Sequence, residues 1–171
     1  MHAKDILIDG FTRIQEEVHA AVEGLGPDGL NHRPGPDANS VAWLVWHLTR
    51  VQDDHVAGAF GLHQVWLTQG WEKRFGLGLK PHDIGYGHTS AQVAGVRVDS
   101  PGLLTGYHDA VHAQSLEALR ALTAGDLERV VDERWDPPVT LGVRLVSVLA
   151  DDLQHVGQAA YLRGLLQSAE A

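Results

Sequence analysis

The chain has 171 residues and a formal net charge of −9, and 44% of its residues are hydrophobic, which is typical of one globular domain over residues 1–171. The acidic balance argues against a nucleic-acid partner, because phosphate binding needs clustered Lys and Arg and the 13 such residues are scattered. The absence of cysteine excludes disulfides, thiolate metal ligands and a cysteine nucleophile, so thiol chemistry would need a thiol from a cosubstrate.

The N-terminal part of the sequence predicts one long helix followed by a loop. Apolar residues recur at three- and four-residue steps over residues 3–23, namely Leu7, Phe11, Ile14, Val18 and Val22. Glycines and a proline end this helix and open a loop over residues 24–39. The N-terminus lacks a signal-peptide core, and no apolar run could span a bilayer, so we expect a cytoplasmic protein with no membrane partner.

A second helix is predicted from Asn39 or Ser40, either of which can cap it, through VAWLVWHLTRVQDDHVAGAFG. His47 lies at the edge of the apolar stripe of this helix. The following residues 61–98 are rich in glycine, although a short helix around Trp71–Phe75 fits the pattern. Loops of this length are often functional, so we expect this one to cover one end of the molecule as a flap.

Two further helices are predicted in the C-terminal half. Ser100 and Pro101 form an N-cap followed by proline at the first helical position, and this helix runs to about Leu122. Thr140 caps a last helix that reaches about Leu166. Four long helices with a loop-rich insertion between the second and third indicate an all-α fold, a four-helix bundle, whose long connections permit crossovers.

The stretch ADDLQHVGQ, residues 150–158, places charge in an otherwise apolar part of the last helix. Asp151 and His155 are four residues apart, so their side chains share one helix face and can reach one cation. Asp152 also points near His155, and taken alone the segment favours a buried Asp–His hydrogen bond. With His47 as third ligand, two histidines and a carboxylate form a facial set for zinc or another divalent metal, and such a set leaves open positions.

Other histidines compete for the same role. His108 and His112 are also four residues apart, and their spacing alone is as good as that of Asp151 and His155. His55 lies two turns beyond His47 on the same helix. His88, within GYGHTS, would face an active site if the loop folded over it.

Three stretches resemble the DinB-like superfamily, namely SVAWLVWHLTRVQDDHVAG, GYHDAVHAQSLEAL and WDPPVTLGVRLVSVLADDLQHVGQAAYLRGLL. The resemblance covers nearly the whole chain and is closest to an actinobacterial branch that includes mycothiol-dependent enzymes. It implies a DinB-like bundle of up-down-down-up order and a divalent metal, zinc or nickel, held by His47, Asp151 and His155. The commoner family residue at position 151 is histidine, so the aspartate here bears on which metal binds and how tightly. Related bundles often dimerise, so a homodimer is expected.

The same resemblance implies an enzyme that uses a low-molecular-weight thiol, such as mycothiol, in S-transfer to or isomerisation of a small electrophile. A metal would lower the pKa of the bound thiol, and Asp152 or His55 would orient a ligand. Arg144 would bind an anionic substrate group, against the commoner role of a solvated arginine. Two alternatives stay open: a metal-dependent hydrolase with Asp54 or Asp152 as base, and a non-catalytic stress or binding protein with a vestigial metal site.

Overall fold

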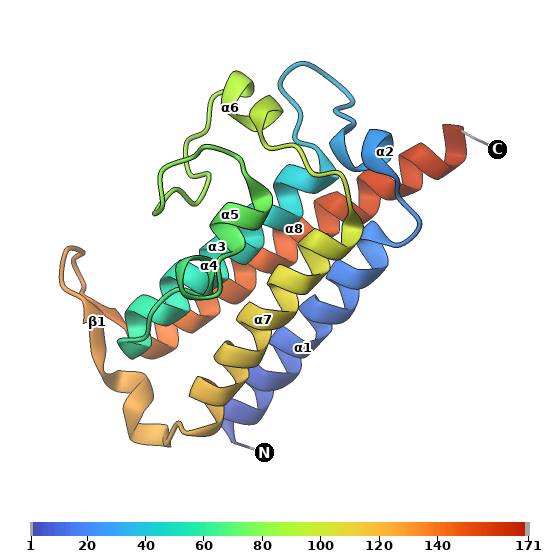
Figure 1. Ribbon diagram of the computed structural model, residues 1–171. Helices are drawn as coiled ribbons and strands as arrows, with labels where there is room; N and C mark the ends of the chain where they lie inside the picture. The colour runs from blue at the N-terminus through green and yellow to red at the C-terminus, as the bar shows by residue number, and fades with distance from the viewer. Residues whose placement is uncertain (1, 170–171) are drawn as a thin grey trace.

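The computed structural model describes residues 2–169, in which four long helices form a bundle (Figure 1). These four are α1 (Ala3–Val22), α3 (Val41–Phe60), α7 (Pro101–Arg120) and α8 (Leu141–Ala169). The short elements are α2 (Pro27–Asn31), α4 (Val65–Thr68), α5 (Trp71–Phe75), α6 (Ser90–Gly95), η1 (Ala124–Glu128), β1 (Val130–Asp132) and β2 (Val139–Thr140). The four predicted long helices and the short one at Trp71–Phe75 are therefore all present.

The order of the helices is up-down-down-up (Figure 1). The chain rises through α1, descends through both α3 and α7, and rises again through α8, so the all-α bundle expected from the sequence is confirmed. Each helix packs against two neighbours, α3 most extensively against α8 and α1 against both α7 and α8. The face shared by α3 and α8 carries the candidate site.

Local signals explain where the second long helix begins and ends. The Ser40 side chain accepts a hydrogen bond from the Trp43 backbone N–H at 3.1 Å, which caps α3 as expected. Gly61 ends the helix in the left-handed conformation, with φ of 67°. Every residue of α3 from Val41 to Asp53 is buried, so its polar side chains there must find partners inside the protein.

The insertion between α3 and α7 packs along the side of the bundle instead of covering only one end. Its helices α4 and α5 contact α7, and α4 also contacts α3 (Figure 1). Three aromatic side chains from this region, Trp66, Trp71 and Phe75, join the hydrophobic core beside Tyr107 of α7. The insertion is thus part of the fold, and its loop over residues 81–88 is hydrogen-bonded to Arg50 of α3.

The connector before α8 contains a feature that the sequence did not indicate. Strands β1 and β2 pair antiparallel, with Val130 opposite Thr140 and Asp132 opposite Val139. Arg144 of α8 and Arg134 both bind the Asp132 carboxylate, each at 2.9 Å, which ties this hairpin to α8.

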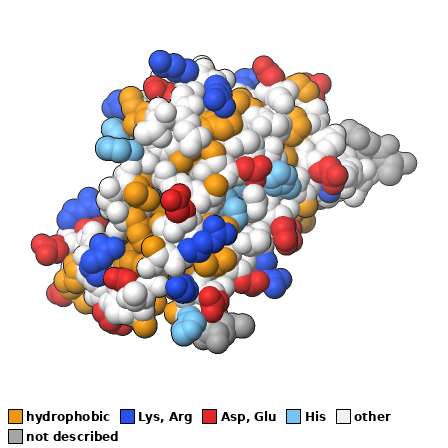
Figure 2. Space-filling model, turned by 60° about the horizontal axis from the view of Figure 1, so that its bottom comes forward, with side chains coloured by type: hydrophobic (Ala, Val, Ile, Leu, Met, Phe, Trp, Pro, Cys, Tyr) orange, Lys and Arg blue, Asp and Glu red, His pale blue; other side chains and the backbone are white. Residues whose placement is uncertain are grey.

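The surface agrees with an acidic chain of dispersed charge. On the face displayed in Figure 2, Lys and Arg side chains are scattered among Asp and Glu side chains. Within residues 2–169, no helix combines the length and apolar character needed to cross a membrane.

Candidate metal centre

Three side chains from two helices converge where α3 packs against α8. His47 of α3 and Asp151 and His155 of α8 each offer one ligand atom, and these atoms lie within 4.8 Å of one another. Asp151 and His155 are one helical turn apart, so both reach the same point beside α3. The structure therefore brings together the three residues that the sequence singled out.

The ring of His47 is held in one orientation. Its Nδ1 is hydrogen-bonded to the backbone carbonyl of Ile84, which can only accept, so Nδ1 carries the proton and Nε2 keeps its lone pair. The Trp43 ring stacks on it, with centroids 4.5 Å apart and planes inclined by 17°. Burial lowers the pKa of His47, which favours the neutral form that a metal requires.

The two ligands on α8 are oriented toward the same point. His155 Nδ1 lies 3.3 Å from Gln158 Oε1, an acceptor, so its Nε2 is the nitrogen directed toward Asp151. His155 Nε2 lies 3.7 Å from Asp151 Oδ1, longer than a hydrogen bond and close to the spacing of about 3.3 Å between ligands of tetrahedral zinc. Asp151 Oδ2 is buried and has no hydrogen-bond partner within residues 2–169.

Asp152 does not belong to this group. Its side chain is fully buried in the bundle, and neither carboxylate oxygen has a partner among the described residues. Burial raises the pKa of Asp152 well above its usual value, and the neighbouring charge of Asp151 adds to the effect. Of the two adjacent aspartates, Asp151 is thus the one that joins the histidines.

Two other proposed participants lie in a separate cavity. His55 Nδ1 is 3.1 Å from Asp54 Oδ2, and Arg144 is half-buried and bound to Asp132. Both His55 and Arg144 line a cavity of about 420 Å³ between α3 and the β1–β2 hairpin, together with Asp54. Neither side chain is part of the converging set at His47.

The competing pair on α7 is buried and lacks a third ligand among the described residues. His108 Nδ1 lies 3.1 Å from the Thr49 hydroxyl oxygen, and the ring of His112 is stacked 6.4 Å away. Burial lowers the pKa of His108 to about 3, so this histidine is a neutral core residue.

The loop after α5 contributes residues that sequence reasoning missed or placed differently. His88 is not part of the converging set. Its side chain packs beside Trp43 and Trp46, and its Nδ1 accepts a hydrogen bond from Trp43 Nε1 at 3.1 Å. The Ile84 carbonyl and Gly85 contact His47 directly. The clustered glycines 85 and 87 were the one signal of a close backbone approach.

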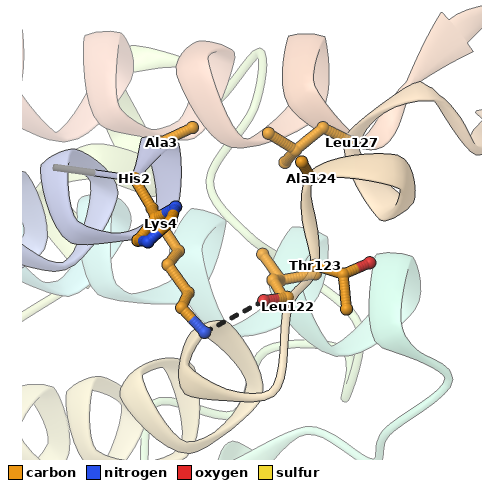
Figure 3. Close-up of a pocket in the computed structure, with 7 residues that line it drawn as sticks. All are labelled: His2, Ala3, Lys4, Leu122, Thr123, Ala124 and Leu127. Atoms are coloured by element: carbon orange, nitrogen blue, oxygen red, sulfur yellow. Dashed lines mark hydrogen bonds between the residues drawn. The ribbon is translucent and has the colours of Figure 1, made fainter.

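Another cavity contains a lysine whose role is structural. A cavity of about 360 Å³ lies at the end of the bundle where α1 begins and α7 ends, and Figure 3 shows residues that line it. The Lys4 ammonium group donates to the carbonyl oxygens of Arg120 and Leu122, each at 3.1 Å. Lys4 therefore caps the C-terminus of α7, a role that accounts for its charge without chemistry.

Comparison with known proteins identifies the family. The model of the DinB superfamily matches residues 11–159. The chain belongs to the DinB superfamily. A crystal structure described as the conserved protein of a locus from Enterococcus faecalis is similar to it, with a TM-score of 0.91 and 32% identity. That likeness covers 98% of this chain and 99% of the other. A search of curated proteins found no match. DinB proteins often bind divalent metals, and the His47–Asp151–His155 cluster is a possible metal site in this member.

Proposed function

We propose that this DinB protein is a divalent-metal-dependent enzyme whose cosubstrate is a low-molecular-weight thiol of the mycothiol type. His47, Asp151 and His155 would hold zinc or nickel, and the reaction would be S-transfer to, or isomerisation of, a small electrophile. The observation that carries the proposal is the convergence of three ligand atoms within 4.8 Å. Two imidazoles and a carboxylate suit zinc and nickel.

The chemistry of the donor set supports a cation at this point. A buried carboxylate oxygen without a partner, such as Asp151 Oδ2, is costly unless a positive group satisfies it. Both histidines already have their Nδ1 atoms engaged, by Ile84 and by Gln158, so their Nε2 atoms are free to bind a metal. The distance of 3.7 Å between His155 Nε2 and Asp151 Oδ1 is also too long for the closed Asp–His hydrogen bond that would be expected of a vestigial site.

The residues also suit a thiol as the reacting partner. With three protein ligands, a bound divalent cation keeps open positions, where it would lower the pKa of a thiol. The chain has no cysteine, so the sulfur nucleophile must come from outside. Trp43 stacks on His47 and meets the His155 ring edge-on at 6.1 Å, so it shields both ligands from water on one side. Asp151 supplies one negative charge, which leaves less positive charge at the centre than three histidines would.

The test combines metal analysis with a thiol assay. Zinc-loaded protein is incubated with mycothiol and monochlorobimane, and the fluorescent thioether is followed as chloride leaves. Bacillithiol, glutathione and thiol-free buffer run in parallel. We expect turnover that requires both metal and thiol and that His155→Ala abolishes. Consumption of the electrophile without thiol would favour the hydrolase. Bound metal with no turnover would favour a binding protein, and failure to retain zinc, nickel, cobalt or manganese would refute the proposal.

A further inference from the structure

The loop over residues 81–88 contacts the candidate ligand His47 from behind and is itself anchored at several points. We propose that this loop is a positioning element, which fixes the tautomer and orientation of His47 so that Nε2 faces the metal. The inference rests on the proposed metal site, but its central claim concerns the histidine ring and can be measured without a metal.

The first step is the contact between the Ile84 carbonyl and His47 Nδ1. A neutral imidazole carries its proton on either nitrogen, and the hydrogen bond of one nitrogen decides the state of the other. A backbone carbonyl oxygen cannot donate, so its position beside Nδ1 selects the tautomer whose Nε2 lone pair is free. If the loop moved, this constraint on the proton would be lost.

The second step is the close approach that Gly85 permits. Gly85 is buried and has φ of +88°, a conformation that favours glycine. A Cβ atom at this position would lie 2.8 Å from His47 Nδ1 and 2.9 Å from Trp46 Cζ3. Only a residue without a side chain therefore lets the backbone pass so near the His47 ring.

The third step is an outer anchor formed by side chains of the loop itself. Asp83 Oδ1 accepts hydrogen bonds from the Gly85 backbone N–H at 2.8 Å and from His88 Nε2 at 3.0 Å. His88 Nδ1 in turn accepts from Trp43 Nε1, and the Trp43 ring stacks on His47. The contacts thus form a closed circuit that starts and ends at His47. The His88 side chain is only 3% exposed, so it is built into this circuit.

The fourth step is an inner anchor from α3. The buried Arg50 side chain donates to the backbone carbonyl of Asp83 at 3.1 Å and to that of Pro81 at 3.4 Å. Arg50 is held by Tyr107 of α7 at 3.1 Å and lies beside Asp53, which balances its charge. The loop is therefore fixed on both sides of Ile84, by Arg50 before it and by His88 after it.

The principal test is His88→Phe, which keeps an aromatic ring between Trp43 and Trp46 but removes both hydrogen bonds of the loop anchor. The matched control is His82→Phe, the same exchange at an exposed histidine of the same loop. Asp83→Ala is the second variant, which breaks the circuit even if His88→Phe does not fold. Folding of each protein is checked by near-ultraviolet circular dichroism.

Two measurements are made on each protein. The nitrogen chemical shifts of His47, recorded without metal, report which ring nitrogen carries the proton. Competition with a chromophoric chelator gives the zinc affinity. We expect the wild type and His82→Phe to hold the proton on Nδ1, and His88→Phe or Asp83→Ala to give mixed tautomers with zinc binding about 10- to 100-fold weaker.

A folded His88→Phe and a folded Asp83→Ala that both keep the wild-type tautomer and affinity would overturn the inference. If the wild type itself binds no zinc, the proposed function fails, while the tautomer measurement still decides the role of the loop. If the wild type binds zinc but the variants keep the wild-type tautomer of His47, the loop does not select the tautomer, and the proposed metal site is unaffected.

Discussion

Removing His155 should abolish stabilisation of this DinB protein by metal while leaving the fold intact. His155 is a more suitable ligand to remove than His47, because its side chain is partly exposed, 19%. Truncation to alanine should therefore cost the metal-free protein about 1 kcal/mol or less. His47, by contrast, is buried against Trp43, so its removal would also disturb packing.

The size of the expected stabilisation by metal follows from the linkage between metal binding and folding. A metal present at a hundredfold excess over its dissociation constant stabilises the folded state by about 2.7 kcal/mol. For a chain of this size, each 1 kcal/mol raises the melting temperature by about 2–4 °C, so we expect a shift of about 5–11 °C for the wild type. His155→Ala leaves one histidine and one carboxylate from different helices, and we expect no measurable shift.

The assay is thermal unfolding with zinc and, separately, with a chelator. His63→Ala, at an exposed histidine away from the cluster, is the control and should behave as the wild type. An equal zinc-induced shift in His155→Ala and the wild type would mean that the metal binds elsewhere. No shift in the wild type with zinc, nickel, cobalt or manganese would refute the reasoning altogether.

Three further outcomes can be measured. Asp151→His removes one negative charge from the ligand set, so water bound to cobalt at this site should have a lower pKa. The pH-dependent change in the cobalt absorption spectrum should therefore occur at a lower pH than in the wild type. Because the folded pKa of His108 is about 3, the unfolded chain binds the proton first as the pH falls below 6.5, and stability is lost in that window. In urea unfolding, His108→Gln should reduce the dependence on pH by up to about 1.4 kcal/mol per pH unit, and an unchanged slope would contradict the burial argument. The homodimer stays a prediction. Uncharged, exposed side chains share one face of α8, where a second copy would pack by two-fold symmetry, namely Val143, Val146, Leu153, Tyr161 and Leu165. Leu153→Arg should give a monomer by light scattering, and a wild type that is already monomeric would exclude this interface.

The helices and the ligand cluster were predictable because both follow from helical periodicity. The four-residue spacing of Asp151 and His155 fixes their common face, and the apolar stripe of α3 places His47 at an edge. Spacing alone did not decide between Asp151 and Asp152, since spacings of three and four both bring a side chain near His155, and the choice of Asp151 came from the family resemblance. The packing of α8 decided it by turning Asp152 into the core.

The loop contacts could not be read from the sequence, because they depend on how an irregular segment closes onto a helix. No periodic pattern predicts that the Ile84 carbonyl contacts His47, because every residue type carries the same backbone carbonyl. The burial of Arg50 was equally hidden, because its partners Asp83 and Tyr107 come from a loop and from another helix. The β1–β2 hairpin escaped notice because strands of two and three residues carry too little alternation.

The candidate ligands come from the second and the last of the four long helices, separated by more than half of the sequence. During synthesis, His47 emerges long before Asp151 and His155, and a single histidine binds a cation only weakly. The cluster exists only after α8 has been made and has docked against α3. Metal would therefore be acquired by a finished bundle, and the order of events is assembly first and loading second.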